Sequence, residues 1–155
     1  TYWDSGYPEH LKTIYDAPVG IFVMGDIPQL PCMGIVGTRQ PSPYGKKMVK
    51  ILTLDLMKAG FCIVSGFARG IDTWAHKTVH KYNGSTIAVF GNGLDICYLG
   101  ENRKLWELLL ENGAFISEFI PGTTPMRLIF PKEIELSAVC QRECWSLRQG
   151  KRAGQ

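Results

Sequence analysis

The chain has 155 residues, of which 45% are hydrophobic, and a formal net charge of +3. It is long enough to bury a core as one domain of ordinary size, and its apolar fraction argues against disorder. Its apolar runs fall short of the roughly 18 residues that cross a bilayer, and its N-terminus lacks the segments of a signal peptide. We therefore expect a cytoplasmic protein with no membrane partner.

The net charge and the positions of the cysteines limit the kinds of ligand and cofactor that the chain is expected to bind. Five basic and three acidic residues lie from Lys132 onward, so the preceding part is nearly neutral and an anion site there must be a local pocket. The cysteines, at positions 32, 62, 97, 140 and 144, form no C-x-x-C pair and fit reduced thiols better than a disulfide framework. Cys140 and Cys144 with His80 match no standard zinc spacing. We expect no metal and no other cofactor.

Strands and helices are predicted to alternate along the chain. Residues 1–30 are expected to form an extension that packs on the sheet, with a short helix over 7–18 and a small strand over 21–24. Apolar runs then predict strands over 33–36, 61–64, 86–90 and 114–116, and helical periodicity predicts helices over 44–59, 71–82 and 102–112. This order is typical of an α/β fold with a mostly parallel sheet and helices on both faces.

The first strand is followed by a turn suited to anions. Gly37, Thr38 and Arg39 come directly after the apolar run, and a helix is predicted to begin at Tyr44. Glycine lets backbone N–H groups approach a phosphate, the helix N-terminus adds partial positive charge, and an arginine offers a guanidinium fork. The turn therefore predicts a phosphate-bearing ligand.

Two later turns have the same composition. The second comprises Ser65, Gly66, Phe67, Arg69 and Gly70, and the third contains Gly91 and Gly93. Loops at the carboxyl ends of parallel strands converge on one edge of a sheet, so Arg39 and Arg69 are expected to face a shared crevice. The alternative is that each arginine is a solvated loop residue, because single glycine-rich patterns occur often by chance.

Several side chains near these turns admit two interpretations. Phe67 is either a surface on which a base stacks or a plug beneath the loop, and Tyr44 and Tyr98 either bind or pack. Asp72 and His76 lie four residues apart on one helix face, which an acid–base pair would require. The simpler interpretation is that Asp72 caps the helix or orients Arg69, and that His76 makes structural hydrogen bonds.

Taken together, the motifs resemble the DNA-processing protein A family, also called DprA or Smf. The resemblance covers roughly residues 7 to 132 and rests on motifs in the family's order: Y-P-x-x-L-x-x-I-x-D-x-P from Tyr7, V-G-T-R-x-P-S-x-Y-G from Val36, S-G-x-A-R-G-I-D-x-x-A-H from Ser65, G-x-G-L-D-x-x-Y from Gly91, and S-E-x-x-P-G from Ser117.

The resemblance implies an extended Rossmann-like domain over residues 31–132 that binds single-stranded DNA and helps load the RecA recombinase during natural transformation. It implies a binding mediator rather than an enzyme, and a homodimer. Position by position, it assigns the first two turns to the DNA pocket and places Lys132 at the start of the family's F-P-x-R-N-R segment. The rival interpretation is a nucleotide-processing enzyme of phosphoribohydrolase type, whose P-G-G-x-G-T-x-x-E signature is absent. A dinucleotide-dependent oxidoreductase is a weaker rival, because no G-x-G-x-x-G is present.

After Lys132 the similarity to the family stops. Residues 133–155 are expected to be an out-of-frame tail, because one added adenine in a permitted codon spelling of residues 132–141 restores the family's Arg-Asn-Arg segment. Loss of the following strands would leave an apolar sheet edge uncovered and remove the dimer surface. We therefore expect a truncated copy that binds DNA weakly or folds poorly.

Overall fold

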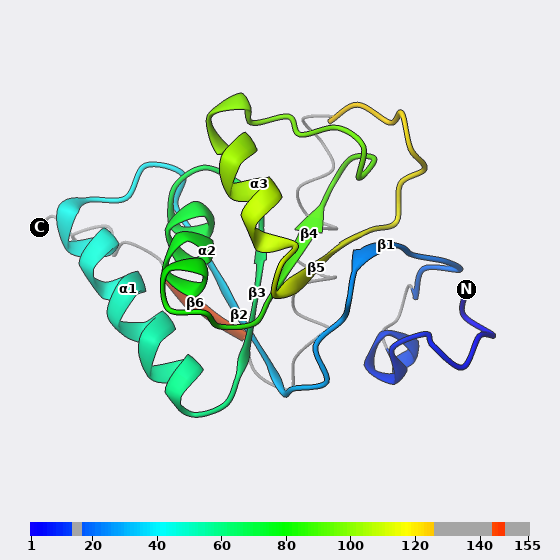
Figure 1. Ribbon diagram of the computed structural model, residues 1–155, viewed down its shortest axis with the longest axis horizontal. Helices are drawn as coiled ribbons and strands as arrows, with labels where there is room; N and C mark the ends of the chain where they lie inside the picture. Colours follow the sequence, from blue (N-terminus) through cyan, green and yellow to red (C-terminus); the bar gives the residue numbers. More distant parts are fainter. Residues whose placement is uncertain (14–16, 126–143, 148–155) are drawn as a thin grey trace, which may run out of the picture.

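A six-stranded, mostly parallel sheet forms the centre of the computed structural model, which describes residues 1–13, 17–125 and 144–147. The strand order is β1-β5-β4-β3-β2-β6, and only the β1–β5 pair is antiparallel. The strands are β1 (Phe22–Gly25), β2 (Cys32–Gly37), β3 (Cys62–Gly66), β4 (Thr86–Phe90), β5 (Gly113–Ser117) and β6 (Cys144–Leu147). The α/β, Rossmann-like class predicted from the sequence is confirmed (Figure 1).

Three α-helices connect the strands and cover one face of the sheet. They are α1 (Pro43–Lys58), α2 (Ile71–Lys81) and α3 (Arg103–Leu109), the last preceded by the 3-10 helix η2 (Gly100–Asn102). The side chains of α1 and α2 pack on Ile35 and Ile63, and those of α3 pack on Ala88 and Phe115, all on the same side of the sheet. The 3-10 helix η1 (Glu9–Thr13) lies on the opposite face, so each face carries helical structure within the described residues.

Local sequence explains where α1 begins and ends. The Ser42 side chain accepts a hydrogen bond from the Gly45 backbone N–H at 3.1 Å, and Pro43 occupies the first helical position, which needs no donor. Gly60, with φ of +85°, follows the last turn and reverses the chain into β3. The first turn of α1 contains no acidic residue, so its N-terminal partial positive charge is not neutralised from within the helix.

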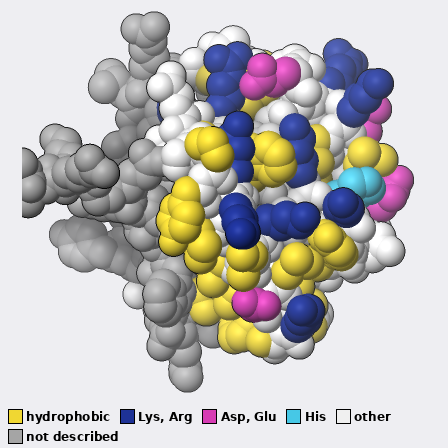
Figure 2. Space-filling view, turned by 90° about the vertical axis from the view of Figure 1, so that its left-hand side faces the viewer, with side chains coloured by type: hydrophobic (Ala, Val, Ile, Leu, Met, Phe, Trp, Pro, Cys, Tyr) yellow, Lys and Arg dark blue, Asp and Glu magenta, His cyan; other side chains and the backbone are white. Residues whose placement is uncertain are grey.

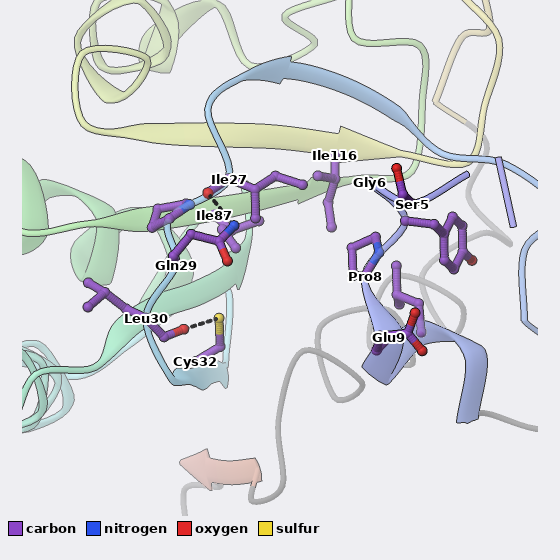
Figure 3. Close-up of a pocket in the computed structure, with 13 residues that line it drawn as sticks. Ser5, Gly6, Pro8, Glu9, Ile27, Gln29, Leu30, Cys32, Ile87 and Ile116 are labelled. Atoms are coloured by element: carbon purple, nitrogen blue, oxygen red, sulfur yellow. Dashed lines mark hydrogen bonds between the residues drawn. The ribbon is translucent and has the colours of Figure 1, made fainter. Parts of the chain in front are cut away.

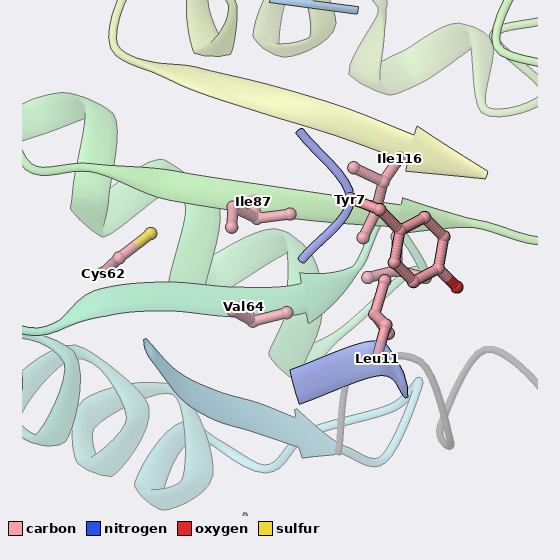
Figure 4. Close-up of a cluster of buried hydrophobic side chains, with 7 residues drawn as sticks. Tyr7, Leu11, Cys62, Val64, Ile87 and Ile116 are labelled. Carbon is pink, nitrogen blue, oxygen red and sulfur yellow. The ribbon is translucent and has the colours of Figure 1, made fainter. Parts of the chain in front are cut away.

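The N-terminal segment covers the sheet face that the α-helices leave open. Tyr7 and Leu11 are buried against Val64 of β3, Ile87 of β4 and Ile116 of β5 (Figure 4). The Tyr7 hydroxyl donates a hydrogen bond to the Pro18 carbonyl at 2.7 Å, and burial raises the pKa of this phenol. Strand β1 joins the sheet itself by pairing with β5, so this segment supplies both an edge strand and part of the core.

A strand not predicted from the sequence lies at the other edge. β6 pairs with β2 in parallel, with Gly34 opposite Cys144 and Gly37 opposite Leu147. The backbone of β2 is therefore hydrogen-bonded on both sides, by β3 and by β6. The segment that pairs with it falls within the tail for which no family structure was expected.

Candidate nucleic-acid interface

The first two turns lie in direct backbone contact at the carboxyl ends of β2 and β3. The backbone N–H of Ile71 donates to the carbonyl of Thr38 at 3.1 Å, which ties the start of α2 to the first turn. A Cβ atom at Gly70 would lie 2.6 Å from the Cα of Arg39 and closer still to the Thr38 carbonyl oxygen. Residues 37–42 and 68–70 therefore form one continuous surface, which we call the cradle.

Two exposed arginines belong to the cradle. Arg39 follows Thr38 in the first turn, and Arg69 directly precedes Gly70 in the second, so they stand on adjoining turns. The shared crevice expected from the sequence requires this proximity. Arg69 is held from one side, because its Nε lies 3.0 Å from Oε1 of Glu101 in η2. Both partners remain more than half exposed, so the pair is screened by solvent.

The second turn is braced from below by hydrogen bonds and aromatic packing. The Thr73 hydroxyl donates to the Ala68 carbonyl at 2.7 Å, and the Tyr98 hydroxyl donates to the Phe67 carbonyl at 3.2 Å. Phe67 is 1% exposed and packs on Phe90 and Phe115 at centroid distances of 5.1 and 6.1 Å. Of the two interpretations open for Phe67, the structure shows the plug beneath the loop and no ring surface on which a base could stack.

Ser65 and Gly66, which the sequence assigned to the second turn, also make contacts that hold the protein's own structure together. Ser65 is buried, and its hydroxyl donates to the Ile35 carbonyl at 2.6 Å, which joins β3 to β2. Gly66 is buried beside the carboxylate of Asp72, which lies in the first turn of α2 and complements the partial positive charge there. An added anion is therefore better placed at Arg39, Arg69 and the N-terminus of α1 than at α2.

His76 is buried on the same helix, beneath the second turn. Its Nδ1 lies 2.9 Å from the hydroxyl of Thr86, which in turn donates to the Ile63 carbonyl, so Nδ1 is the donor of the neutral ring. Burial disfavours the charged imidazolium and lowers the pKa of His76 to about 4. Asp72 is 6% exposed. The residues that resembled an acid–base pair are therefore both enclosed within the protein.

The third turn is closed by its own neighbours. Gly91 and Gly93 are buried, and the Gly93 backbone N–H donates to the Thr123 carbonyl at 2.9 Å. The Asp95 carboxylate accepts from the backbone N–H of Gly122 at 2.9 and 3.0 Å. The Gly93 backbone N–H, which the sequence assigned to phosphate, thus bonds to Thr123 instead. Lys132, the remaining predicted site residue, lies outside the described residues.

A pocket of about 430 Å³ lies away from the cradle, between the N-terminal segment and the connection from β1 to β2 (Figure 3). Ile87 and Ile116 form its floor, and Pro8, Gln29 and Leu30 contribute to its walls. No lysine or arginine is among its described lining residues, so it does not suit a phosphate. The contact between Glu101 and Arg69 could not be predicted from the sequence, because only the tertiary fold brings together residues 32 positions apart.

Comparison with known proteins matches this architecture to one family. The sequence model of DNA recombination-mediator protein A matches residues 1–141. A protein Smf from Synechocystis sp. is 39% identical over 145 residues, which is 90% of this chain and 36% of the relative. The DNA processing protein DprA from Bacillus subtilis is 41% identical over 128 residues, which is 81% of this chain and 43% of the relative. The chain therefore belongs to the DNA recombination-mediator protein A family.

Solved structures agree with this assignment. The X-ray structure of DNA processing protein A from Streptococcus pneumoniae has a TM-score of 0.86 at 36% identity, covering 92% of this chain and 51% of that one. DNA processing protein A from Helicobacter pylori, studied for its single-stranded DNA binding mode, has a TM-score of 0.81 at 28% identity, covering 90% and 65% respectively. This chain thus spans about half to two thirds of these two structures and less than half of the two relatives named above.

Within the described residues, no helix has the length and apolarity to cross a membrane.

Proposed function

We propose that this chain binds single-stranded DNA at the cradle. The observation that carries the proposal is the backbone contact between Gly70 and the Thr38–Arg39 peptide, because it joins two exposed arginines into one cationic surface. Single strands are bound by cationic grooves that follow the phosphates, and guanidinium groups can both hold phosphate and stack on bases. The described DNA-binding mode of the Helicobacter pylori relative supports the same class of ligand.

The same proposal covers the wider role. We infer a binding mediator that helps load RecA during natural transformation and acts in the cytoplasm, with family membership as the support. A binding role agrees with the enclosure of Asp72 and His76, which leaves no open acid–base pair at these two positions. Incubation with nucleoside monophosphates tests the rival role, and release of free base would contradict the proposal.

The direct test measures oligonucleotide affinity across a range of salt concentrations. If Arg39 contacts one phosphate, Arg39→Ala should weaken binding and reduce the slope of log K against log salt by about 0.7, the increment for one contact to a single strand. Arg69→Ala should behave alike. Lys58→Gln is the matched control, because it removes one exposed cation from the end of α1 farthest from the cradle.

Three outcomes would count against the proposal. An unchanged slope in both arginine variants would remove the cradle from the binding site. An equal loss in Lys58→Gln would show that net charge alone governs affinity. Preference for double-stranded over single-stranded oligonucleotides would contradict the ligand class. A frame-restored version of the chain, measured beside it, tests whether residues beyond Lys132 add contacts.

A further inference from the structure

An exposed tryptophan stands beside the cradle, on the first turns of α2. Trp74 is 36% exposed, whereas large aromatic residues are usually more deeply buried. Lys46 of α1 and Lys77 of α2 place their Nζ atoms 5.7 and 5.8 Å from the centroid of its ring. Two cations from different helices thus lie over the indole ring in cation–π contact.

The position of this cluster connects it to the cradle. The backbone N–H of Trp74 donates to the carbonyl of Gly70 at 3.0 Å, and Gly70 in turn touches Arg39. Lys46 lies in the first turn of α1, where its backbone N–H donates to the Ser42 carbonyl at 3.0 Å. The cluster therefore continues the cradle sideways over the N-terminal turns of both helices.

The surrounding surface has the charge that a polyanion requires. Figure 2 shows lysine and arginine side chains gathered with hydrophobic ones on the side of the molecule where α1 lies. Apart from Lys58 at the far end of α1, the exposed cations of α1 and α2 are Lys46, Lys47, Lys50, Lys77 and Lys81, and the exposed carboxylate of these two helices is Asp55. Within the described residues, neither Lys46 nor Lys77 belongs to an ion pair, so a phosphate can draw each Nζ from the Trp74 ring without separating it from a carboxylate.

We propose that Trp74 stacks on a base of the bound single strand while Lys46 and Lys77 hold the neighbouring phosphates. This inference rests on the proposed function and extends its site beyond the glycine-rich turns. The combination of ring and cations favours a nucleic acid over an acidic peptide, because every base offers a π-face whereas a run of carboxylates needs only the lysines.

The test crosses a change in the protein with a change in the ligand. Trp74→Ala and Trp74→Phe are titrated with an oligothymidylate and with an abasic oligonucleotide of the same length and charge. We expect Trp74→Ala to bind the oligothymidylate about tenfold more weakly, since stacking on aromatic side chains contributes on that scale. Trp74→Phe should retain most of the affinity, and neither change should affect the abasic strand. Lys46→Gln and Lys77→Gln should each reduce the salt slope by about 0.7.

Control measurements separate the stacking role of Trp74 from the proposed binding of single-stranded DNA at the cradle. Trp3→Ala removes an indole that is 78% exposed in the N-terminal segment, and it should leave binding unchanged. Equal affinity of Trp74→Ala and the parent chain, or an equal loss on the abasic strand, would overturn the stacking role. Competition by polyglutamate as strong as that by oligothymidylate would overturn it as well. If Arg39→Ala weakens binding and Trp74→Ala does not, only this inference fails; if the parent chain binds no oligonucleotide, both proposals fail.

Discussion

The first two glycine-rich turns and the third look alike in the sequence but differ in the structure. In the cradle, the turns after β2 and β3 lie against each other and present Arg39 and Arg69 on the outside. In the third turn, Gly91 and Gly93 are buried, and the nearby Asp95 accepts from the Gly122 backbone N–H. In both places a glycine makes room for the protein's own chain, for Arg39 at Gly70 and for Ile120 at Gly93, and the exposed arginines are what set the cradle apart.

This difference shows what a glycine at a strand end does and does not imply. A missing side chain lets a ligand reach the backbone, and it equally lets another chain segment do so. Gly93 makes room for the Ile120 carbonyl, to which a Cβ atom would come within 2.8 Å. An anion site also needs exposed cations beside the glycine, and the first two turns supply these in Arg39 and Arg69.

The largest expected effect on stability and DNA affinity comes from Gly70→Ala, which disrupts the contact between the first two turns. Gly70 has φ of +85°, and an added Cβ would overlap the backbone of Thr38 and Arg39. Backbone strain and overlap together should lower the free energy of unfolding by roughly 3 to 5 kcal/mol. Urea unfolding measures this change, and oligonucleotide titration should show a parallel loss of affinity.

Gly60→Ala is the control for the strain alone. Gly60 has the same φ of +85°, but nothing lies within 4 Å of the position of its Cβ. We expect a loss of about 1 to 2 kcal/mol in stability, with DNA affinity retained in the folded protein. Equal losses in the two variants would mean that the contact between the turns adds nothing.

Acid should weaken the support beneath the second turn through His76. The pKa of His76 is lowered to about 4 in the folded protein, below its ordinary 6.5, because the ring is buried. Between these values the unfolded chain binds a proton that the folded chain excludes, so stability is full above about pH 6.5 and falls toward pH 4. The difference corresponds to roughly 3 kcal/mol.

Unfolding in urea at a series of pH values measures this dependence. His76→Gln should flatten the curve between pH 6.5 and 4, whereas His80→Gln, on the same helix but only half-buried, should leave the contribution of His76 in place. A slope in His76→Gln as steep as in the parent chain would assign the acid sensitivity to another group.

Gly93→Ala should separate stability from binding in the third turn. Its Cβ would lie 2.6 Å from the Asp95 carboxylate and 3.0 Å from the Gly122 backbone nitrogen, so neighbouring groups must move. We expect a loss of about 1 to 3 kcal/mol in the free energy of unfolding, as for overpacked sites. The salt slope of oligonucleotide binding should not change, and a reduced slope would place this turn within the DNA site after all.

The smallest effect is expected from Glu101→Gln at the rim of the cradle. Both members of the Arg69–Glu101 pair are exposed, with side-chain exposures of 63% and 58%, so their contribution to stability should stay below about 0.5 kcal/mol. Removing the carboxylate beside Arg69 should leave oligonucleotide affinity equal or up to about twofold higher at low salt, because it repels phosphate. A marked loss of affinity would instead show that Glu101 positions Arg69 for binding.

Much of the fold could be predicted because local patterns fix its elements. The strand Thr86–Phe90 has the bounds predicted from its apolar run, and the helix after the first turn begins at Pro43, one residue before the prediction. The helix predicted over 102–112 is shorter, because α3 ends at Leu109 and the chain must turn to place Gly113 beside Thr86. Hydrophobic periodicity predicts which face of a helix is apolar, but it does not predict the residue at which the helix ends and the chain enters the next strand.

The candidate site was less predictable than the fold. Arg39 and Arg69 could be selected from the sequence, because arginines follow glycines at strand ends. The burial of Phe67, in contrast, depends on Phe90 and Phe115, which lie on two other strands. The sequence did not predict a role for Trp74, since a single tryptophan in a helix is more often part of a core than of a surface.

The amino-acid sequence by itself determined the alternation of strands and helices and the placing of glycines and arginines where strands end, because these follow from hydrophobic period and backbone freedom over a few residues. Only the tertiary structure decided which turns touch, which one closes on its own chain, and which aromatic rings stay outside. Those outcomes depend on strand order, such as the pairing of β1 with β5 and of β2 with β6, and strand order brings together residues far apart in the chain.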